Sequence, residues 1–186
     1  RPMIALPMHP SNAFTIEELN ANLEDILHAC EEDVQKLIGR KDVHLDLCSK
    51  IENGKLRVDQ GVIAGCAGGL YDSIYEAASI LKGRTGGCGD YALSVYPGSQ
   101  PIMMELVRTG VISELMASGA TVRTAFCGPC FGAGDVPANG ALSIRHTTRN
   151  FPSREGSKPG NGQLAGVALM DARSIAATTA NGGILT

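Results

Sequence analysis

The tetrapeptide CGPC places two cysteines, Cys127 and Cys130, two residues apart. Thiols at this spacing bind a metal or a cluster, form a redox pair, or are an inert pair at a turn. Gly128 and Pro129 favour a tight turn that brings both thiolates to one centre. A thioredoxin-type pair opens a helix, and the glycine-rich run that follows is a poor helix start, so the spacing favours metal or cluster binding.

A third thiol, Cys66, lies in the glycine-rich turn AGCAGG. A zinc site with three cysteines would want a fourth protein ligand, and His146 is the candidate. An iron–sulfur cubane held by three cysteines would instead leave one iron open to bind a substrate as a Lewis acid. Cys66 could also be a buried turn cysteine, and a lone histidine is more often structural. The residues alone leave these alternatives open.

Two arginines, Arg149 and Arg154, lie in the loop HTTRNFPSREGSKPGNG, which is too rich in Pro and Gly to be helical. A solvated loop arginine is the plain interpretation of either one. Two guanidinium groups beside a cysteine site are also suited to paired hydrogen bonds with carboxylates. They therefore suggest a di- or tricarboxylic acid ligand.

The elements that must position these residues alternate along the chain. Short apolar strands are predicted at 61–66, 90–96, 121–126, 141–147 and 165–169, and helices at 15–39, 71–82, 100–110, 111–118 and 170–180. A weaker pattern suggests a short strand at 43–47 and a turn at Asn53-Gly54. This order predicts an α/β fold, a three-layer α/β/α domain with a mostly parallel sheet. Ligands bind beyond the carboxyl ends of such strands, where Cys66, Cys127 and Arg149 are expected to meet.

The remaining cysteines have weaker roles. Cys30 lies on the apolar stripe of the first predicted helix and Cys48 follows a short strand, so both are expected to be packing residues. Cys88 precedes a strand and is expected at the opposite edge of the sheet. We therefore leave all three outside the candidate site.

Length and composition exclude several classes of protein. The 186 residues are 44% hydrophobic, enough for one core, and the net charge of −3 argues against nucleic-acid binding. No apolar run reaches the roughly 18 residues of a membrane span, and no signal peptide is visible. Cysteine usage then favours a reducing cytoplasm. Residues 1–57 are expected to be a linker and helix leading into an α/β domain at 58–186, and the start at Arg1 suggests a piece of a longer protein.

Four motifs, AGCAGG, YPGSQPIMMELVRTG, CGPCFG and TTRNFPSREG, resemble the cluster-binding domain of the aconitase and isopropylmalate isomerase family of hydro-lyases. The resemblance runs from about residue 58 to the end. It implies that Cys66, Cys127 and Cys130 hold a 4Fe-4S cluster and that Arg149 and Arg154 contact a hydroxy di- or tricarboxylic acid substrate. Such a cluster loses iron in air, so an aerobic preparation is expected to lack it.

The chain departs from the family pattern at several positions. Ala67-Gly68 stands where the family has Thr-Asn, Thr148 where it has Asn, and Ser153 where it has Gly. Family members are several-fold longer, and their catalytic serine and Asp–His groups have no counterpart here. The resemblance thus implies one domain without catalytic residues of its own, inactive without the other domains of the parent enzyme. A zinc-stabilised domain and a thiol–disulfide protein using Cys127 and Cys130 remain the alternatives.

Overall fold

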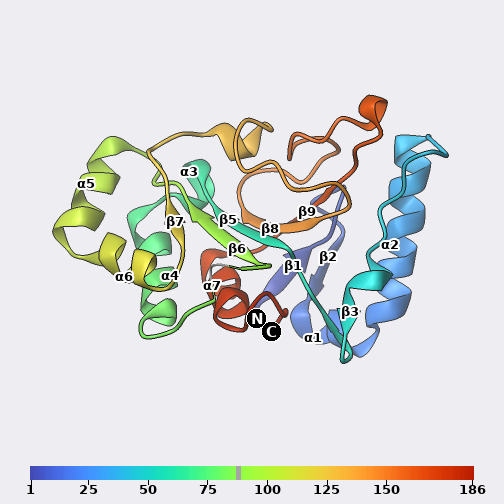
Figure 1. Ribbon diagram of the computed structural model, residues 1–186. Helices are drawn as coiled ribbons and strands as arrows, with labels where there is room; N and C mark the ends of the chain where they lie inside the picture. Colours follow the sequence, from blue (N-terminus) through green and yellow to red (C-terminus); the bar gives the residue numbers. More distant parts are fainter. Residues whose placement is uncertain (87–88) are drawn as a thin grey trace.

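A computed structural model describes residues 1–86 and 89–186 and shows a seven-stranded sheet with helices packed against it (Figure 1). Cys88 lies outside the described residues. The strands are β1 (Met3–Ala5), β2 (Ala13–Thr15), β5 (Gln60–Ile63), β6 (Ala92–Val95), β7 (Thr121–Val122), β8 (Leu142–His146) and β9 (Gly166–Leu169), and β3 (Ile51–Glu52) and β4 (Lys55–Leu56) form a separate hairpin. The helices are α1 (Ile16–Ala21), α2 (Leu23–Ile38), α3 (Gly65–Gly68), α4 (Tyr71–Leu81), α5 (Gln100–Arg108), α6 (Val111–Ala117) and α7 (Ala172–Ala180), with 3₁₀ turns η1 (Cys48–Lys50), η2 (Gly128–Cys130) and η3 (Pro159–Asn161).

The strand order is β2-β1-β9-β8-β5-β6-β7, and β9 through β7 run parallel. The chain moves outward from β5 through β6 to β7, and then returns to the other side of β5 with β8 and β9. Strand order therefore reverses between β5 and β8. The predicted α/β class with a mostly parallel sheet is confirmed, and the reversal creates the place where such sheets bind ligands.

The amino-terminal helical region begins and ends with standard caps. Thr15 and Glu18 form a capping box at the start of α1, and Gly39, with φ of 66°, ends α2. The single helix expected between Thr15 and Gly39 is interrupted at Asn22, whose φ of −135° and ψ of 40° are not helical. Apolar side chains at helical spacing then turn one face of α2 into the core.

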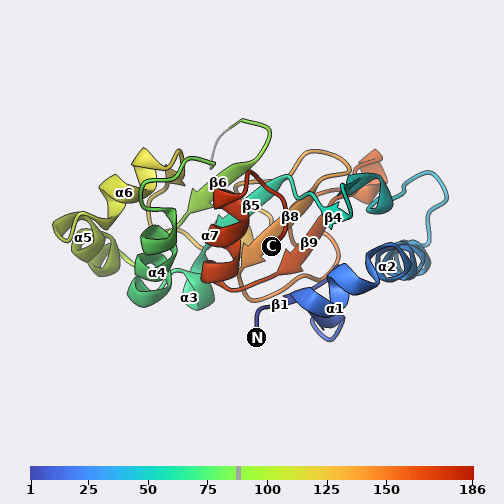
Figure 2. The ribbon, with the colours of Figure 1, turned by 90° about the horizontal axis from the view of Figure 1, so that it is seen from below.

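The two faces of the sheet differ in chemistry because side chains alternate along each strand. One face, which we call the helical face, carries Leu93 and Ile144, paired in register across β5, and is covered by α4 and α7. These two helices lie side by side in Figure 2. The other, the polar face, carries Gln60, Ser94, Ser143 and Arg145 and is covered by the loop 127–136 rather than by a long helix. The helices α4 and α7 and the loop 127–136 therefore pack on opposite faces of the same strands.

Several local predictions need correction. The segment 43–47 is not a strand, although its alternate residues are buried, because it has no partner strand. The strand expected at 121–126 ends at Val122. The first fifteen residues, expected to be a connecting segment, form the β1–β2 hairpin, and Ala5 of β1 pairs with Leu169 of β9. The turn at Asn53-Gly54 is confirmed as the β3–β4 turn, whereas the boundary between residues 57 and 58 stays a prediction.

Candidate functional site

The candidate site lies at the carboxyl edge of the sheet, where the strand order reverses. Cys66 lies in α3, directly after β5, and the preceding Gly65 has a φ of 73°. A Cβ on Gly65 would lie 2.7 Å from the Sγ of Cys130 and 3.8 Å from the Sγ of Cys127. The absence of a side chain at Gly65 thus lets the turn after β5 approach both thiols of the CGPC motif.

The CGPC motif forms the tight turn that its sequence predicts. The backbone N–H of Cys130 donates to the carbonyl of Cys127 at 3.1 Å, and that of Ala133 donates to the carbonyl of Gly128 at 2.9 Å. Cys130 is buried, whereas Cys127 and Cys66 are exposed. The turn therefore holds one thiol against the protein and presents another to solvent.

The three thiols share one electrostatic environment. Burial raises the pKa of Cys130 above its usual value, the neighbouring Cys127 and Cys66 raise it further, and the backbone N–H of Thr148 opposes them. A donor from the loop after β8 thus points at a thiol from the loop after β7. This interaction joins the segments after β5, β7 and β8 in one site.

The spacing of the ligand atoms distinguishes one ion from a larger group. Within the described chain, no three ligand atoms of Cys66, Cys127, Cys130 and His146 all lie within 4.8 Å of one another. Thiolates on one tetrahedral zinc, with Zn–S bonds of about 2.3 Å, would lie about 3.8 Å apart. A multi-iron cluster places its ligands on separate irons and does not require so close an approach.

His146 has a structural role. Its Nδ1 accepts a hydrogen bond from the backbone N–H of Ala172 at 3.1 Å, at the start of α7. A Cβ on Gly68 would lie 2.2 Å from the carbonyl oxygen of His146 and 3.0 Å from its ring. The departure at Gly68 from the Thr-Asn pattern is therefore built into the packing, because this backbone leaves no room for a side chain.

The loop with the two arginines packs beside the CGPC motif. The Asn150 side chain donates to the carbonyl of Leu6 at 2.8 Å, which fixes the loop to the segment after β1. A Cβ on Gly132 would lie 2.8 Å from the Cα of Gly156, so the two loops meet backbone to backbone. None of the ion pairs within the described residues involves Arg149, which is exposed, or Arg154, which is half-buried.

Ser153 explains one of the departures. Its φ of 61° lies in the left-handed region that glycine adopts freely. The serine just before Arg154 therefore adopts a backbone conformation that a glycine would adopt without strain.

A buried polar network under the site was missed by the sequence analysis. Arg145, on the polar face of β8, donates from Nη1 to the Pro129 carbonyl and from Nη2 to the Asp135 carbonyl, both at 2.7 Å. The carboxylate of Asp135 accepts from Ser94 at 3.0 Å and from Tyr96 at 2.5 Å. The available signal was a charged residue inside the apolar strand pattern ALSIRHT.

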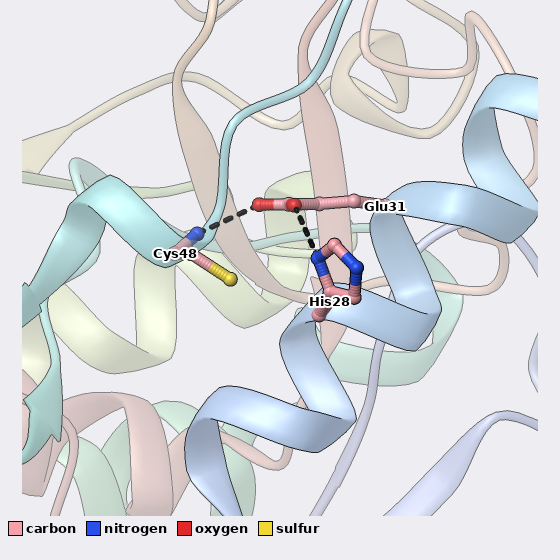
Figure 3. A group of neighbouring side chains, drawn as sticks. All are labelled: His28, Glu31 and Cys48. Atoms are coloured by element: carbon pink, nitrogen blue, oxygen red, sulfur yellow. Dashed lines mark hydrogen bonds and ion pairs between the residues drawn. The ribbon is translucent and has the colours of Figure 1, made fainter.

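A second group of side chains, of types that can bind a metal, lies on α2 and η1, away from the three candidate cysteines (Figure 3). His28, Glu31 and Cys48 have ligand atoms within 4.8 Å of one another. Glu31, however, already accepts the backbone N–H groups of Leu47 and Cys48, at 2.5 and 2.7 Å, and His28 is 68% exposed. The geometry is explained by Glu31 tying η1 to α2.

The expected packing roles of the two other described cysteines agree with this arrangement. Cys30 lies in the core and donates to the carbonyl of Pro7 at 3.0 Å, and burial raises its pKa to about 12. Cys48 packs against the core, and burial together with Glu31 raises its pKa to about 11. Both thiols are therefore poor candidates for cluster binding.

A cavity of about 750 Å³ lies between residues 7–12, α2, Phe151 and Pro152. None of the three candidate cysteines lines it. Cys66 and Cys127 are instead exposed, as are the rings of Phe126 and Phe131 beside the CGPC motif, whereas Cys130 is buried. The cysteine site is the stronger candidate for a functional site, because thiols from separate segments converge there.

No helix in the described parts of the chain has the length and apolar character to cross a membrane.

The fold and the three thiols define an α/β domain with a candidate metal or cluster site where the strand order reverses. The model of the aconitase family (aconitate hydratase) matches residues 1–177. The chain therefore belongs to the aconitase family.

Its curated relatives include large subunits of 3-isopropylmalate dehydratase. That of Caldanaerobacter subterraneus subsp. tengcongensis is 32% identical over 158 residues, which is 84% of this chain and 38% of the relative. That of Thermoanaerobacter pseudethanolicus is 36% identical over 126 residues, 67% of this chain and 30% of the relative. That of Clostridium kluyveri is 28% identical over 171 residues, 90% of this chain and 40% of the relative. The chain thus spans less than half the length of these relatives.

Proposed function

We propose that this chain is the cluster-binding part of an aconitase-type hydro-lyase, with Cys66, Cys127 and Cys130 holding a 4Fe-4S cluster. The observation that carries the proposal is the approach of the two CGPC thiols to Gly65, next to Cys66, at the carboxyl edge of the sheet. Three thiols, of which Cys66 and Cys127 are exposed to solvent, fit such a group. When bound, the cluster would supply a Lewis-acidic iron for a substrate hydroxyl and carboxylate.

The residues of this chain would bind and orient the rest of the substrate. Arg149 and Arg154 follow β8 in the loop beside the CGPC motif, and no internal ion pair among the described residues engages them. Their guanidinium groups would take carboxylates by paired hydrogen bonds. A hydroxy di- or tricarboxylic acid is therefore the proposed substrate class.

The chain would work together with other parts of the enzyme. Cys66 and Cys127 are exposed, and the relatives named above are large subunits that are more than twice as long as the matched region. We expect other domains of the parent protein, and a smaller subunit, to cover the site and supply the base that removes a substrate proton. The 186 residues alone are expected to be inactive, and a cytoplasmic location stays a prediction.

Two features weigh against the alternative functions. A zinc site would need His146 as fourth ligand, but its Nδ1 accepts the Ala172 N–H, which leaves the ring proton of the neutral imidazole on Nε2, and a metal-bound ring nitrogen carries no proton. A thioredoxin-type redox pair opens an α-helix, whereas the CGPC motif forms the short 3₁₀ turn η2 and the described residues between it and β8 form no α-helix. We therefore place the cluster first.

Anaerobic reconstitution with iron and sulfide tests the proposal. We expect about four iron and four sulfide per chain with the broad visible absorbance of a cluster, and loss of both in Cys66→Ala, Cys127→Ala or Cys130→Ala. Cys48→Ala is the matched control and should load normally. Stoichiometric zinc that depends on His146, or a Cys127–Cys130 disulfide that cycles at a thioredoxin-like potential, would overturn the proposal.

A further inference from the structure

We propose that Arg145 is a positioning residue that holds the CGPC turn from beneath and so sets Cys127 and Cys130 relative to Cys66. The positioning of the turn follows from contacts within this chain. Its consequence for cluster binding rests on the function proposed above.

The guanidinium joins the sheet to two points of one loop. Nη1 donates to the carbonyl of Pro129, the residue directly before Cys130, and Nη2 donates to the carbonyl of Asp135. Nε donates to Ser143 Oγ at 3.0 Å, and Nη2 also reaches Gln60 Oε1 at 3.1 Å, both on the polar face. One planar side chain thus connects β5 and β8 to the ends of the segment 129–135.

The surroundings fix the guanidinium itself. Arg145 is 1% exposed, and Gln60 accepts from Ser143 at 2.7 Å while donating to the Asp135 carbonyl at 3.0 Å. The acidic groups of Asp135 and Glu155 lie near enough to stabilise its charge. A buried cation with so many partners has little freedom to move.

A lysine could not replace these contacts. The two loop carbonyls, the serine hydroxyl and the glutamine amide are met by separate N–H groups of one rigid fork, whereas an ammonium is a compact point charge on a flexible stem. We therefore expect Arg145→Lys to keep the charge but to loosen the turn. Arg145→Met should loosen it further, because the Pro129 carbonyl loses its Arg145 donor and the Asp135 carbonyl keeps only its donor from Gln60.

Hydrogen–deuterium exchange separates positioning from general support of the core. In Arg145→Met we expect amides of residues 127–134 to exchange about tenfold faster or more, while amides of β6 keep their wild-type rates. Arg145→Lys should give an intermediate acceleration. Arg123→Met is the matched control, because Arg123 is 48% exposed and reaches only the Asp135 carboxylate, at 3.5 Å.

Equal acceleration in β6 and in 127–134 would show a purely structural role and overturn the inference, as would no acceleration in either. If Arg145→Met does not fold, Gln60→Met provides the second test. This variant removes one acceptor of the Arg145 fork and one donor to Asp135, and it should accelerate the same amides to a smaller extent. No local acceleration in Gln60→Met would then overturn the inference.

Anaerobic cluster loading of the same variants tests the consequence. Loss of an outer-shell partner typically lowers metal affinity about 10–100-fold, and we expect faster cluster loss of that order in Arg145→Met but not in Arg123→Met. If the wild-type protein takes up no cluster, the proposed function fails while the exchange result still stands. If the wild type loads and Arg145→Met retains its cluster equally long, the inference about the cluster fails and the proposed function survives.

Discussion

The helical and polar faces of the sheet are built from neighbouring residues of the same strands, yet they hold their covering layers by different forces. On the helical face, Leu93 and Ile144 are fully buried under α4 and α7. On the polar face, Arg145 and Ser94 hold a loop through directional hydrogen bonds. Apolar contact tolerates small shifts of a helix, whereas hydrogen bonds fix particular atoms of a loop. Apolar packing on the helical face therefore supplies most of the stability of this domain, whereas hydrogen bonds on the polar face position its cysteines.

Truncation on the helical face should give the largest loss of stability. Leu93→Ala removes a fully buried side chain and leaves a cavity, so the free energy of unfolding should fall by about 2–5 kcal/mol. Urea unfolding measures the change, and the exposed Leu37 provides the control variant Leu37→Ala. A loss confined to the CGPC loop, with unchanged global stability, would contradict the separation of the two faces.

Removal of one hydroxyl on the polar face should have a smaller and more local effect. Tyr96 donates a hydrogen bond to Asp135. Burial is the main cause that raises the pKa of Tyr96 to about 12, and the hydrogen bond to Asp135 adds to it. Tyr96→Phe leaves a carboxylate oxygen without this donor and should cost about 1–3 kcal/mol. The exposed Tyr75 gives the control Tyr75→Phe. Hydrogen–deuterium exchange of the amides of residues 127–136 should accelerate more than that of the amides of β6. Equal acceleration in both segments would contradict a local effect.

The sequence could predict the helical face better than the polar one for a physical reason. Periodic apolar residues identified β5, α4 and α7 because burial follows the period of the element. The role of Arg145 depends on backbone carbonyls of Pro129 and Asp135, which have no signature in side-chain type. The same limit explains why the segment 43–47 alternated like a strand but paired with none. The pattern of residue types predicts which side chains are buried, whereas the pairing of strands depends on the tertiary structure.

The same limit applies to the candidate site. The CGPC spacing and the Gly-rich turn at Cys66 are local motifs, so their shared position at the carboxyl edge of a parallel sheet could be predicted. The fit of Gly68 under His146 could not, because it depends on a close approach between segments far apart in sequence. Single-residue departures from a family pattern therefore need the structure for their explanation.

His146 links the site edge to the start of α7 and should make stability depend on pH. Burial lowers the pKa of His146 below its ordinary value of 6.5, with the Asp171 carboxylate opposing. The unfolded chain then binds a proton that the folded chain does not, so stability is full above about pH 6.5 and falls as the pH drops below it. In His146→Asn, whose amide oxygen can still accept the Ala172 N–H, urea unfolding between pH 7 and 5, roughly spanning that titration, should show a shallower fall. Parallel curves for the two proteins would contradict this assignment.

The smallest effect is expected at Ser153, where the polar-face loops are shaped by backbone conformation rather than by contacts. A serine at φ of 61° is strained by about 1–2 kcal/mol, which glycine relieves, but glycine also gains about 0.5–1 kcal/mol of freedom in the unfolded chain. Ser153→Gly should therefore raise the free energy of unfolding by about 0–1.5 kcal/mol and leave cluster loading unchanged. Gly156, at φ of 101° and packed against Gly132, gives the opposing variant. Gly156→Ala should destabilise the loop, because both the φ and the close approach exclude a Cβ. A destabilised Ser153→Gly would show that the serine side chain, and not the shape of the backbone, holds the loop that presents Arg154.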